Sequence, residues 1–313
     1  FLRGQGHEVL TCDVGWFIED LLCAAKDAPP TFPCDVTHLA TFNPLTALPH
    51  DLSDVEAVIH LADLSNDLEG AVPEDRFAAA LTSTMTLAFA CAKRAIPLLV
   101  ASSGSVYGAA GGAVMDETSP TNPQTHYAWH KLRTEEALWD VPDLRVVILR
   151  LGTLYGFCPR MRLDAAINLF CAQAILEGCV TLTSDGEAWR PHLALADACR
   201  AFGTALALLG REEKQRYVVA SENATMRQVV GYLRQFKPCE MTRGAVRDTR
   251  SYRANAGKFL GATGFTWDVA LPQGIAQTLD DLACALEAYA PLRRFHRAKR
   301  LLSLGTVPPW RIV

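Results

Sequence analysis

Three patterns are missing from this sequence, and each absence removes a class of function. No two cysteines form a C-x-x-C pair, no histidine lies in an H-E-x-x-H motif, and no apolar run reaches the roughly 18 residues of a membrane-spanning helix. The ten cysteines stand singly along the chain, and its start carries no secretory leader pattern. We therefore expect a cytoplasmic protein with reduced thiols, no metal site and no passage through a membrane.

An excess of basic residues is also lacking. The formal net charge is -4, which supplies no general attraction to nucleic acid or anionic lipid. The chain has 313 residues, of which 50% are hydrophobic, and this is enough to bury the core of one large domain or of two closely packed ones. These bounds favour a soluble enzyme over a polyanion-binding protein.

Short β-branched runs alternate with helical segments along the chain. The clearest strands are predicted over residues 8–12, 57–62, 98–102 and 146–151. Residues 76–94 and 127–139 predict helices with broad apolar stripes, which we expect to be buried or to pair with copies of themselves. The alternation predicts an α/β fold whose doubly wound parallel sheet binds ligands beyond the carboxyl ends of its strands.

Tyr127 and Lys131 are the first chemical candidates. They stand four residues apart on a predicted helix and therefore share one face. An ammonium beside a phenol favours the phenolate, which brings a group with a reference pKa of about 10 toward base chemistry near neutral pH. The spacing Tyr-x-x-x-Lys is common by chance, so the surrounding residues must support this interpretation.

Side chains at the ends of predicted strands supply further candidates. Asp13 can accept both ribose hydroxyls of an adenosine and would repel a 2′-phosphate, which favours NAD over NADP, but it can equally cap the next helix. Asp35 can accept from an adenine amino group or belong to a plain turn. Ser103 can hydrogen-bond a substrate alcohol beside the phenolate, although most serines at strand ends only satisfy the backbone.

Together these residues resemble the extended short-chain dehydrogenases/reductases, in the branch that acts on nucleotide sugars and includes UDP-glucose 4-epimerase. The resemblance extends over about residues 6–274, and its specificity lies in the joint order and spacing of the motifs. These motifs are Gly6-His7-Glu8-Val9 leading to Asp13, Val58-Ile59-His60-Leu61-Ala62, Ser102-Ser103-Gly104-Ser105-Val106-Tyr107-Gly108, Tyr127 with Lys131, Leu149-Arg150 with Tyr155-Gly156, Asp185-Gly186, Trp189-Arg190-Pro191 with Asp197, and Asp248-Thr249-Arg250-Ser251-Tyr252-Arg253.

The resemblance implies an NAD cofactor and assigns three catalytic residues. Tyr127 would remove a proton from a sugar hydroxyl, Lys131 would hold the nicotinamide ribose and lower the pKa of the phenol, and Ser103 would hydrogen-bond the reacting oxygen. The residues that would hold or line the path of the cofactor are Asp13, Asp35, Leu61, Ala62, Tyr127 and Lys131.

The resemblance also implies a nucleotide-diphosphate sugar as substrate. Asn168, Arg190 and Arg250 would contact its nucleotide and diphosphate, and two arginines suit a diphosphate because a guanidinium can bridge its oxygens in two places. A purely structural alternative for Arg190 is stacking on the neighbouring Trp189.

Several departures from the family pattern limit these assignments. The G-x-x-G-x-x-G turn that holds the cofactor pyrophosphate is absent, with about 20 residues missing by comparison with a complete strand-turn-helix unit. We expect a fragment rather than a natural loss, because a sheet without its central strand would expose unpaired edges. Thr82 and Thr84 stand where many relatives have an asparagine near the nicotinamide, which leaves the cofactor's orientation open. The arginines within residues 159–164 would widen or recharge the sugar site.

The reaction implied by the resemblance is NAD-dependent epimerisation at C4 through a transient 4-keto sugar. Dehydration is not expected, because Ser103-Gly104-Ser105 replaces the Thr-Asp-Glu of the 4,6-dehydratases. Two alternatives stay open: a one-way 4-ketoreductase or dehydrogenase, and a catalytically silent nucleotide-sugar-binding relative that has lost its glycine turn.

We expect two interleaved domains. Residues 1–150 would form the NAD-binding Rossmann domain, incomplete at its start, and residues 151–313 would form mainly a smaller α+β substrate domain. The two apolar helices predict a homodimer through a four-helix bundle, as in the family. The basic stretch within residues 288–313 is expected to be a solvated helix.

Overall fold

A parallel sheet forms the centre of the fold in the computed structural model, which describes residues 1–9, 12–13, 32–33, 54–63, 74–158, 161–211, 213–246 and 248–289. Its strands lie in the order β10-β6-β4-β3 and all run in the same direction. They are β3 (Val58–His60), β4 (Leu98–Ser103), β6 (Val146–Leu151) and β10 (Lys214–Val219). Their carboxyl ends therefore meet at one edge of the sheet, where the register pairs Ser103 with Leu151.

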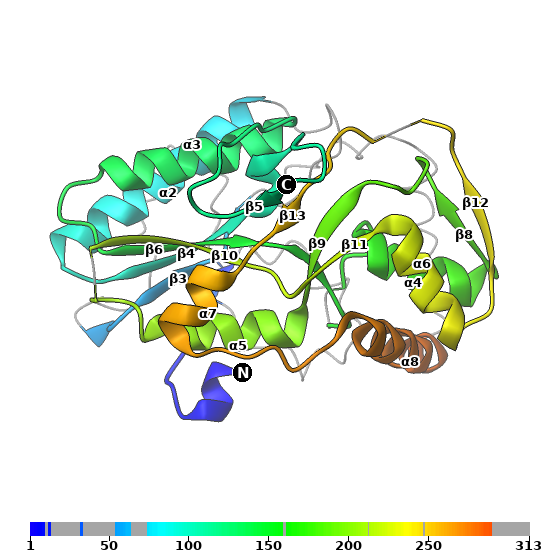
Figure 1. The fold of residues 1–313 in the computed structure, drawn as a ribbon. Coiled ribbons are helices and arrows are strands. Elements are labelled where there is room, and N and C mark those ends of the chain that lie inside the picture. Colours follow the sequence, from blue (N-terminus) through cyan, green and yellow to red (C-terminus); the bar gives the residue numbers. More distant parts are fainter. Residues whose placement is uncertain are drawn as a thin grey trace.

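Helices cover both faces of this sheet (Figure 1). One layer contains α2 (Glu74–Lys93) and α3 (His126–Asp140), and the opposite layer contains α5 (Leu195–Leu206) and α7 (Gly257–Thr263). This arrangement confirms the predicted doubly wound α/β fold.

Alternate residues of β4 and β6 face opposite layers, as the period of a strand requires. One set packs with buried residues of α2 and α3, and the other packs with buried residues of α5 and α7. The first set is Leu98, Val100, Val146 and Ile148, and the second is Leu99, Val147 and Leu149. Because both faces are covered, these strands are continuous apolar runs in the sequence.

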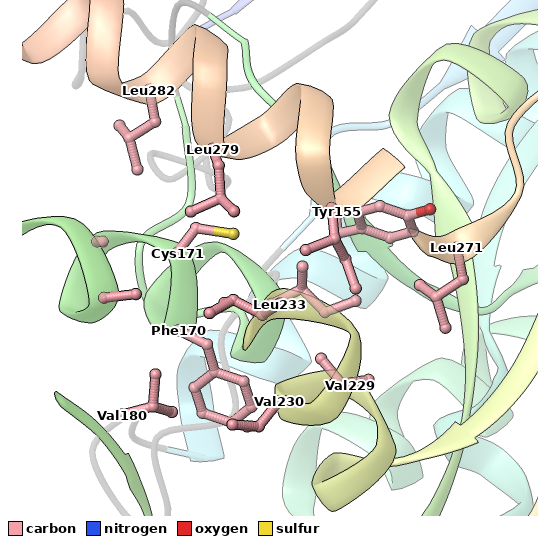
Figure 2. Close-up of a cluster of buried hydrophobic side chains, with 14 of the residues drawn as sticks. Tyr155, Phe170, Cys171, Val180, Val229, Val230, Leu233, Leu271, Leu279 and Leu282 are labelled. Atoms are coloured by element: carbon pink, nitrogen blue, oxygen red, sulfur yellow. The ribbon is translucent and has the colours of Figure 1, made fainter. Parts of the chain in front are cut away.

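A second group of elements surrounds a separate core. The helices α4 (Ala166–Leu176), α6 (Met226–Phe236) and α8 (Leu271–Tyr289) pack around the buried side chains of Figure 2. Two small sheets accompany them. One has the order β11-β9-β7, and the other pairs β12 with β8. Their bounds are β7 (Thr153–Tyr155), β8 (Cys179–Leu182), β9 (Trp189–Ala194), β11 (Glu222–Thr225) and β12 (Glu240–Arg243).

The chain returns to the central sheet after entering this second group, since α5, β10 and α7 all follow β7 in the sequence and pack in the first. The proposed boundary near residue 150 stays a prediction. The remaining short elements are η1 (Leu2–Gln5), β1 (Cys12–Asp13), β2 (Phe32–Pro33), η5 (Gly104–Tyr107), β5 (Val114–Met115) and β13 (Arg253–Ala254).

Most predicted element positions agree with the structure, with two exceptions. The first strand was predicted over residues 8–12, but Glu8 lies outside it and β1 begins at Cys12, paired in parallel with β2. The apolar stripe of α2 is only partly buried: Phe77 is 7% exposed, whereas Phe89 is 56% exposed. In the described part of the chain, no helix is both long and apolar enough to cross a membrane.

Candidate active site

Tyr127 and Lys131 lie one turn apart near the start of α3. Thr125 caps this helix, because its hydroxyl oxygen accepts a hydrogen bond from the Ala128 amide at 3.2 Å. The Lys131 ammonium lies 5.7 Å from the centre of the Tyr127 ring. Lys131 is buried, whereas Tyr127 is half-buried. The predicted pair is thus formed, with its phenol on the more exposed side.

Ser103 ends β4 beside this pair, at the edge where α3 packs against β4 and η5. Its hydroxyl oxygen accepts from the Ser105 amide at 3.1 Å and so caps η5, while its own proton remains a possible donor. Gly104 follows, and a side chain there would put its Cβ 3.0 Å from the Tyr252 hydroxyl. Glycine at this position therefore lets the Tyr252 phenol approach the end of the strand.

Asp63 occupies the far side of Lys131. One oxygen of its carboxylate accepts from the ammonium at 2.6 Å, and the other lies 2.8 Å from Nε2 of His130. Lys131 also donates to the carbonyl oxygen of Ala101, at 2.9 Å. Burial raises the pKa of Asp63, but the charge of Lys131 and the hydrogen bond from His130 lower it more, so it lies well below its usual range.

A buried ion cluster fixes α3 against the sheet. Glu135, one turn beyond Lys131, accepts hydrogen bonds from Ser102 of β4 and from Arg150 of β6, whose Nη2 lies 2.7 Å from Oε2. Arg216 of β10 lies 2.8 Å from the same oxygen. Arg150 also donates to the Tyr107 hydroxyl at 3.0 Å. Three strands therefore hold the helix that carries Tyr127 and Lys131.

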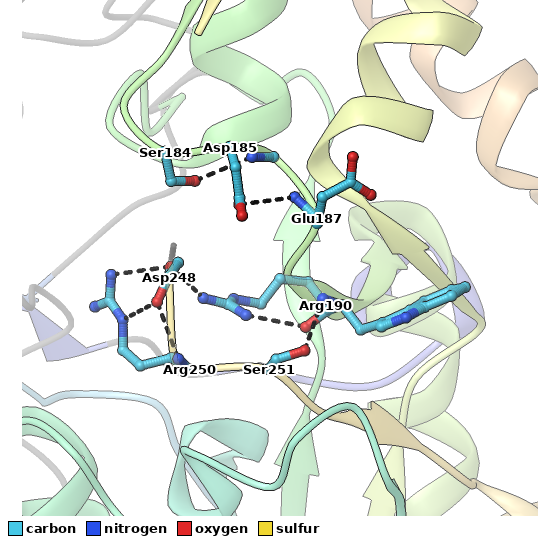
Figure 3. Close-up of polar contacts among 9 residues, drawn as sticks. Ser184, Asp185, Glu187, Arg190, Asp248, Arg250 and Ser251 are labelled. Atoms are coloured by element: carbon cyan, nitrogen blue, oxygen red, sulfur yellow. Dashed lines mark hydrogen bonds and ion pairs between the residues drawn. The ribbon is translucent and has the colours of Figure 1, made fainter. Parts of the chain in front are cut away.

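Two predicted substrate arginines converge on one carboxylate. Figure 3 shows Arg190 of β9 and Arg250 on either side of Asp248. Arg190 Nη2 lies 2.7 Å from Oδ2 of Asp248, and Arg250 Nε lies 3.1 Å from Oδ1. Burial raises the pKa of Asp248, but the bond from Arg250 and the charge of Arg190 lower it below its usual range. The three groups carry two positive charges and one negative, so the cluster keeps a net positive charge for an anion.

A different arginine stacks on Trp189 in this structure. It is Arg253 whose guanidinium lies over the Trp189 ring, 5.2 Å from its centre. Arg190 instead donates through Nη1 to the carbonyl oxygen of Trp189, at 2.9 Å.

Asn168 serves the chain itself in this structure. Its amide oxygen accepts from Gly156 N at 3.0 Å, and its amide nitrogen donates to the carbonyl oxygen of Arg162, also at 3.0 Å. It thereby anchors the start of α4 to the segment that carries Arg162. Its predicted contact with the nucleotide stays a prediction.

Arg162 is a third cation of this region. Its side chain is 46% exposed, and its guanidinium lies 2.5 Å from Asp164. Burial lowers its pKa, but the hydrogen bond and charge of Asp164, followed by the influence of Tyr127, raise it overall. Burial raises the pKa of the Tyr252 phenol, and the charge of Arg190 partly offsets this effect.

The residues predicted to line the cofactor are compatible with that role. Leu61 follows β3 and is 62% exposed, and Ala62 is also exposed, so apolar surface is offered at the carboxyl end of the sheet. Within the described residues, Lys131 uses two of its three N–H donors, and the third could serve a ribose hydroxyl. The Lys131 donor and the apolar surface of Leu61 and Ala62 fit a dinucleotide. Asp13 ends β1, but its side chain lies outside the described residues, as does Asp35.

A doubly wound parallel sheet with a tyrosine, a lysine and a serine at its carboxyl edge defines a Rossmann-fold enzyme that binds a dinucleotide. The comparison of sequences makes this specific. The chain belongs to the NAD dependent epimerase/dehydratase family, which it matches over residues 1–220. NAD is therefore its cofactor, as predicted.

Solved structures of similar fold include an epimerase and a dehydratase. MoeE5, in complexes with NAD and UDP-glucose or UDP-glucuronic acid, is 26% identical; in the first complex the match covers 91% of this chain and 93% of that one, with a TM-score of 0.73. UDP-glucose 4-epimerase of Thermotoga maritima is 20% identical over 91% and 94%, with a TM-score of 0.76. TunA, an NDP-hexosamine 5,6-dehydratase, is 22% identical over 90% and 92%, with a TM-score of 0.75. The last two support the fold alone.

The sequence analysis assigned no role to three acidic residues of this region: Asp63, Glu135 and Asp248, the last of which stands in one of the family motifs. Asp63 and Glu135 could have been found from position, because one directly follows Leu61 and Ala62 and the other stands four residues after Lys131. His126 and His130 are also four apart, a spacing that can suit a metal. Among the residues with described positions, however, no group of three or more potential ligands gathers.

Proposed function

We propose that the protein is a nucleotide-sugar epimerase that inverts C4 of a UDP-linked hexose. The observation that carries this proposal is the Tyr127 ring held 5.7 Å from the Lys131 ammonium, at the sheet edge where Ser103 ends β4. Membership of the NAD dependent epimerase/dehydratase family is consistent with it.

In this proposal each side chain has one task. Tyr127 takes the proton of the C4 hydroxyl, and Lys131 favours the phenolate form that can do so. Ser103 donates a hydrogen bond to the reacting oxygen, since its hydroxyl proton is not used in capping η5. Lys131 would hold the ribose of NAD, and the bound cofactor would supply hydride transfer from C4 and back to the other face of the sugar ring. Tyr127 then gives its proton back, so the reaction consumes no outside reductant.

Arg190 and Arg250 hold the diphosphate of the substrate in this proposal. Their shared partner Asp248 is only partly buried, with 21% of its side chain exposed. A diphosphate carries more negative charge than one carboxylate and can be bridged by both arginines. The homodimer and the cytoplasmic location remain expectations.

A UDP-linked uronic acid is a second candidate substrate, favoured by Arg162. This arginine lies close enough to Tyr127 to be influenced by it, and almost half of its side chain is exposed. A carboxylate on the sugar ring would match such a cation. MoeE5, which shares this fold, binds UDP-glucuronic acid in one of its structures.

The test incubates the purified protein and NAD with UDP-glucose or UDP-glucuronic acid and follows both C4 epimers by NMR. We expect one pair to interconvert without net change in nicotinamide absorbance. Tyr127→Phe should lower kcat by roughly 10²- to 10⁴-fold. Tyr232→Phe, at a half-buried tyrosine of α6, is the matched control and should retain activity.

Three outcomes would contradict the proposal. Undiminished turnover by Tyr127→Phe would remove the assigned base. Stoichiometric change in nicotinamide absorbance would indicate a dehydrogenase or ketoreductase. If Arg162→Leu lowers the turnover of UDP-glucose and of UDP-glucuronic acid equally, the uronic acid candidate is rejected, because it predicts a selective loss of turnover with UDP-glucuronic acid.

A further inference from the structure

Asp63 is a buried acid that the proposed reaction leaves without a role. It lies three residues after the end of β3, and only 9% of its side chain is exposed. Its two oxygens contact consecutive residues of α3, His130 at 2.8 Å and Lys131 at 2.6 Å. The ion pair therefore joins the carboxyl edge of the sheet to the helix that carries Tyr127.

The acid changes what Lys131 can do for the phenol. An isolated ammonium favours the phenolate, whereas an ammonium paired with a carboxylate presents a smaller net positive field. Burial lowers the pKa of Lys131, but the charge of Asp63 leads the opposing effects and raises it overall. Asp63 thus secures the charge of Lys131 while it partly offsets the effect of that charge on Tyr127.

We propose that Asp63 is a positioning residue of the active site that holds the Lys131 ammonium in place and, through this ion pair, sets the pH at which Tyr127 becomes the phenolate. The assignment of Tyr127 as base rests on the proposed function, but the effect of Asp63 on its phenol can be measured without any substrate.

Other charged and titratable groups surround the three residues. Lys131 is also influenced by Glu135 of α3. Burial lowers the pKa of His60 to about 4, so this residue of β3 is neutral near neutral pH. The pKa of Arg162 and the pKa of Tyr252 both respond to the charge of Tyr127, and His130 contacts Asp63. Of the acids Asp63 and Glu135, it is Asp63 whose carboxylate accepts a hydrogen bond from the Lys131 ammonium, so its charge should affect Lys131 more.

The experiment measures the tyrosinate midpoint of Tyr127 by ultraviolet absorbance during a pH titration. Subtracting the titration of the matching Tyr127→Phe protein isolates this phenol from the other six of the 7 tyrosines. Asp63→Asn and the smaller Asp63→Ser both remove the negative charge. Each should move the midpoint to lower pH by roughly one unit, because the phenolate is then favoured by an unpaired cation.

Two control variants accompany the measurement of the Tyr127 midpoint. Asp63→Glu retains the charge and should keep the midpoint within about 0.3 units of the parent protein, a small fraction of the shift expected from removing it. Asp268→Asn makes the same acid-to-amide change in an ion pair with Arg200, outside the site, and should leave the midpoint unchanged. The acidic limb of kcat/KM, where activity rises with pH, should follow the absorbance midpoint if Tyr127 is also the catalytic base.

An unchanged midpoint in whichever neutral variant retains its fold by circular dichroism would overturn the role of Asp63. Having two neutral variants of different size guards against a folding defect in one. A shifted midpoint in a protein without epimerase activity would uphold Asp63 and reject the proposed function, so the two failures are distinguishable.

Discussion

Glu135→Gln tests whether the buried ion cluster positions α3. Glu135 is 1% exposed and is the shared partner of Arg150, which is 2% exposed, and of Arg216. The amide would remove the counter-charge that Arg150 and Arg216 share, and such a break in a buried pair costs about 3–5 kcal/mol. With about 2.1 cal/mol/K of unfolding entropy for each of the 313 residues, Tm should fall by roughly 5–8 °C.

The assay is thermal unfolding followed by circular dichroism at neutral pH. Glu136→Gln is the matched control, since it makes the same change at the next, exposed residue and should move Tm by about 1 °C or less. Replacing Glu135 and Arg150 together by methionine should recover part of the loss, because no buried charge from this pair then remains. A fall below about 2 °C for Glu135→Gln would show that water or neighbouring groups compensate the arginines, and the reasoning would be wrong.

Three further predictions concern pH, substrate binding and a turn. Burial lowers the pKa of His192 from 6.5 to about 4, so as pH falls the unfolded chain binds a proton on this histidine before the folded protein does. The free energy of unfolding should therefore fall by about 3 kcal/mol between about pH 6.5 and about pH 4. His192→Gln should flatten this pH dependence in urea unfolding. Arg190→Lys should raise the Kd for UDP at least about tenfold in calorimetry, because an ammonium cannot bridge two oxygens. The control Arg227→Lys changes an arginine of an exposed ion pair and should leave this Kd unchanged. Gly108→Ala should prevent stable folding, since its φ is +50° and the new Cβ would collide with backbone across the turn. Gly111→Ala has φ +61° but open space, so it should cost only about 1 kcal/mol in the same unfolding assay.

The sequence predicted the central sheet well because its strands are buried on both faces. Continuous apolar runs such as Val146–Leu151 leave little choice of element, and β6 has the predicted bounds. The first strand was less well predicted, because short runs near Cys12 carry weaker patterns. Phe89 was expected to be buried from helical periodicity alone, yet periodicity cannot distinguish a core face from one left exposed on a single chain.

In the candidate site, too, some features could be predicted from the sequence and others could not. The pairing of Tyr127 with Lys131 follows from helix geometry and could be predicted from spacing. The contacts of Asp63 with Lys131 and of Asp248 with Arg190 join residues 68 and 58 positions apart, so no local pattern indicates these two contacts. Spacing within one element is visible in a sequence, whereas the counter-ion that a cation finds across the fold depends on tertiary packing.

Every cation assigned to the site has an acid beside it, and exposure decides which of these pairs can serve a ligand. The Glu135 and Arg150 side chains are at most 2% exposed, so an anion could reach that pair only by opening the core, and its role is structural. Arg190, Arg250 and Arg162 are 18%, 40% and 46% exposed, and their acids can exchange contacts with solvent or with a ligand. Lys131, at 8%, lies near the buried extreme. In the proposed function, Lys131 with its buried acid acts on Tyr127 as a fixed field, while the more exposed Arg190, Arg250 and Arg162 can exchange contacts with their acids for contacts with the substrate.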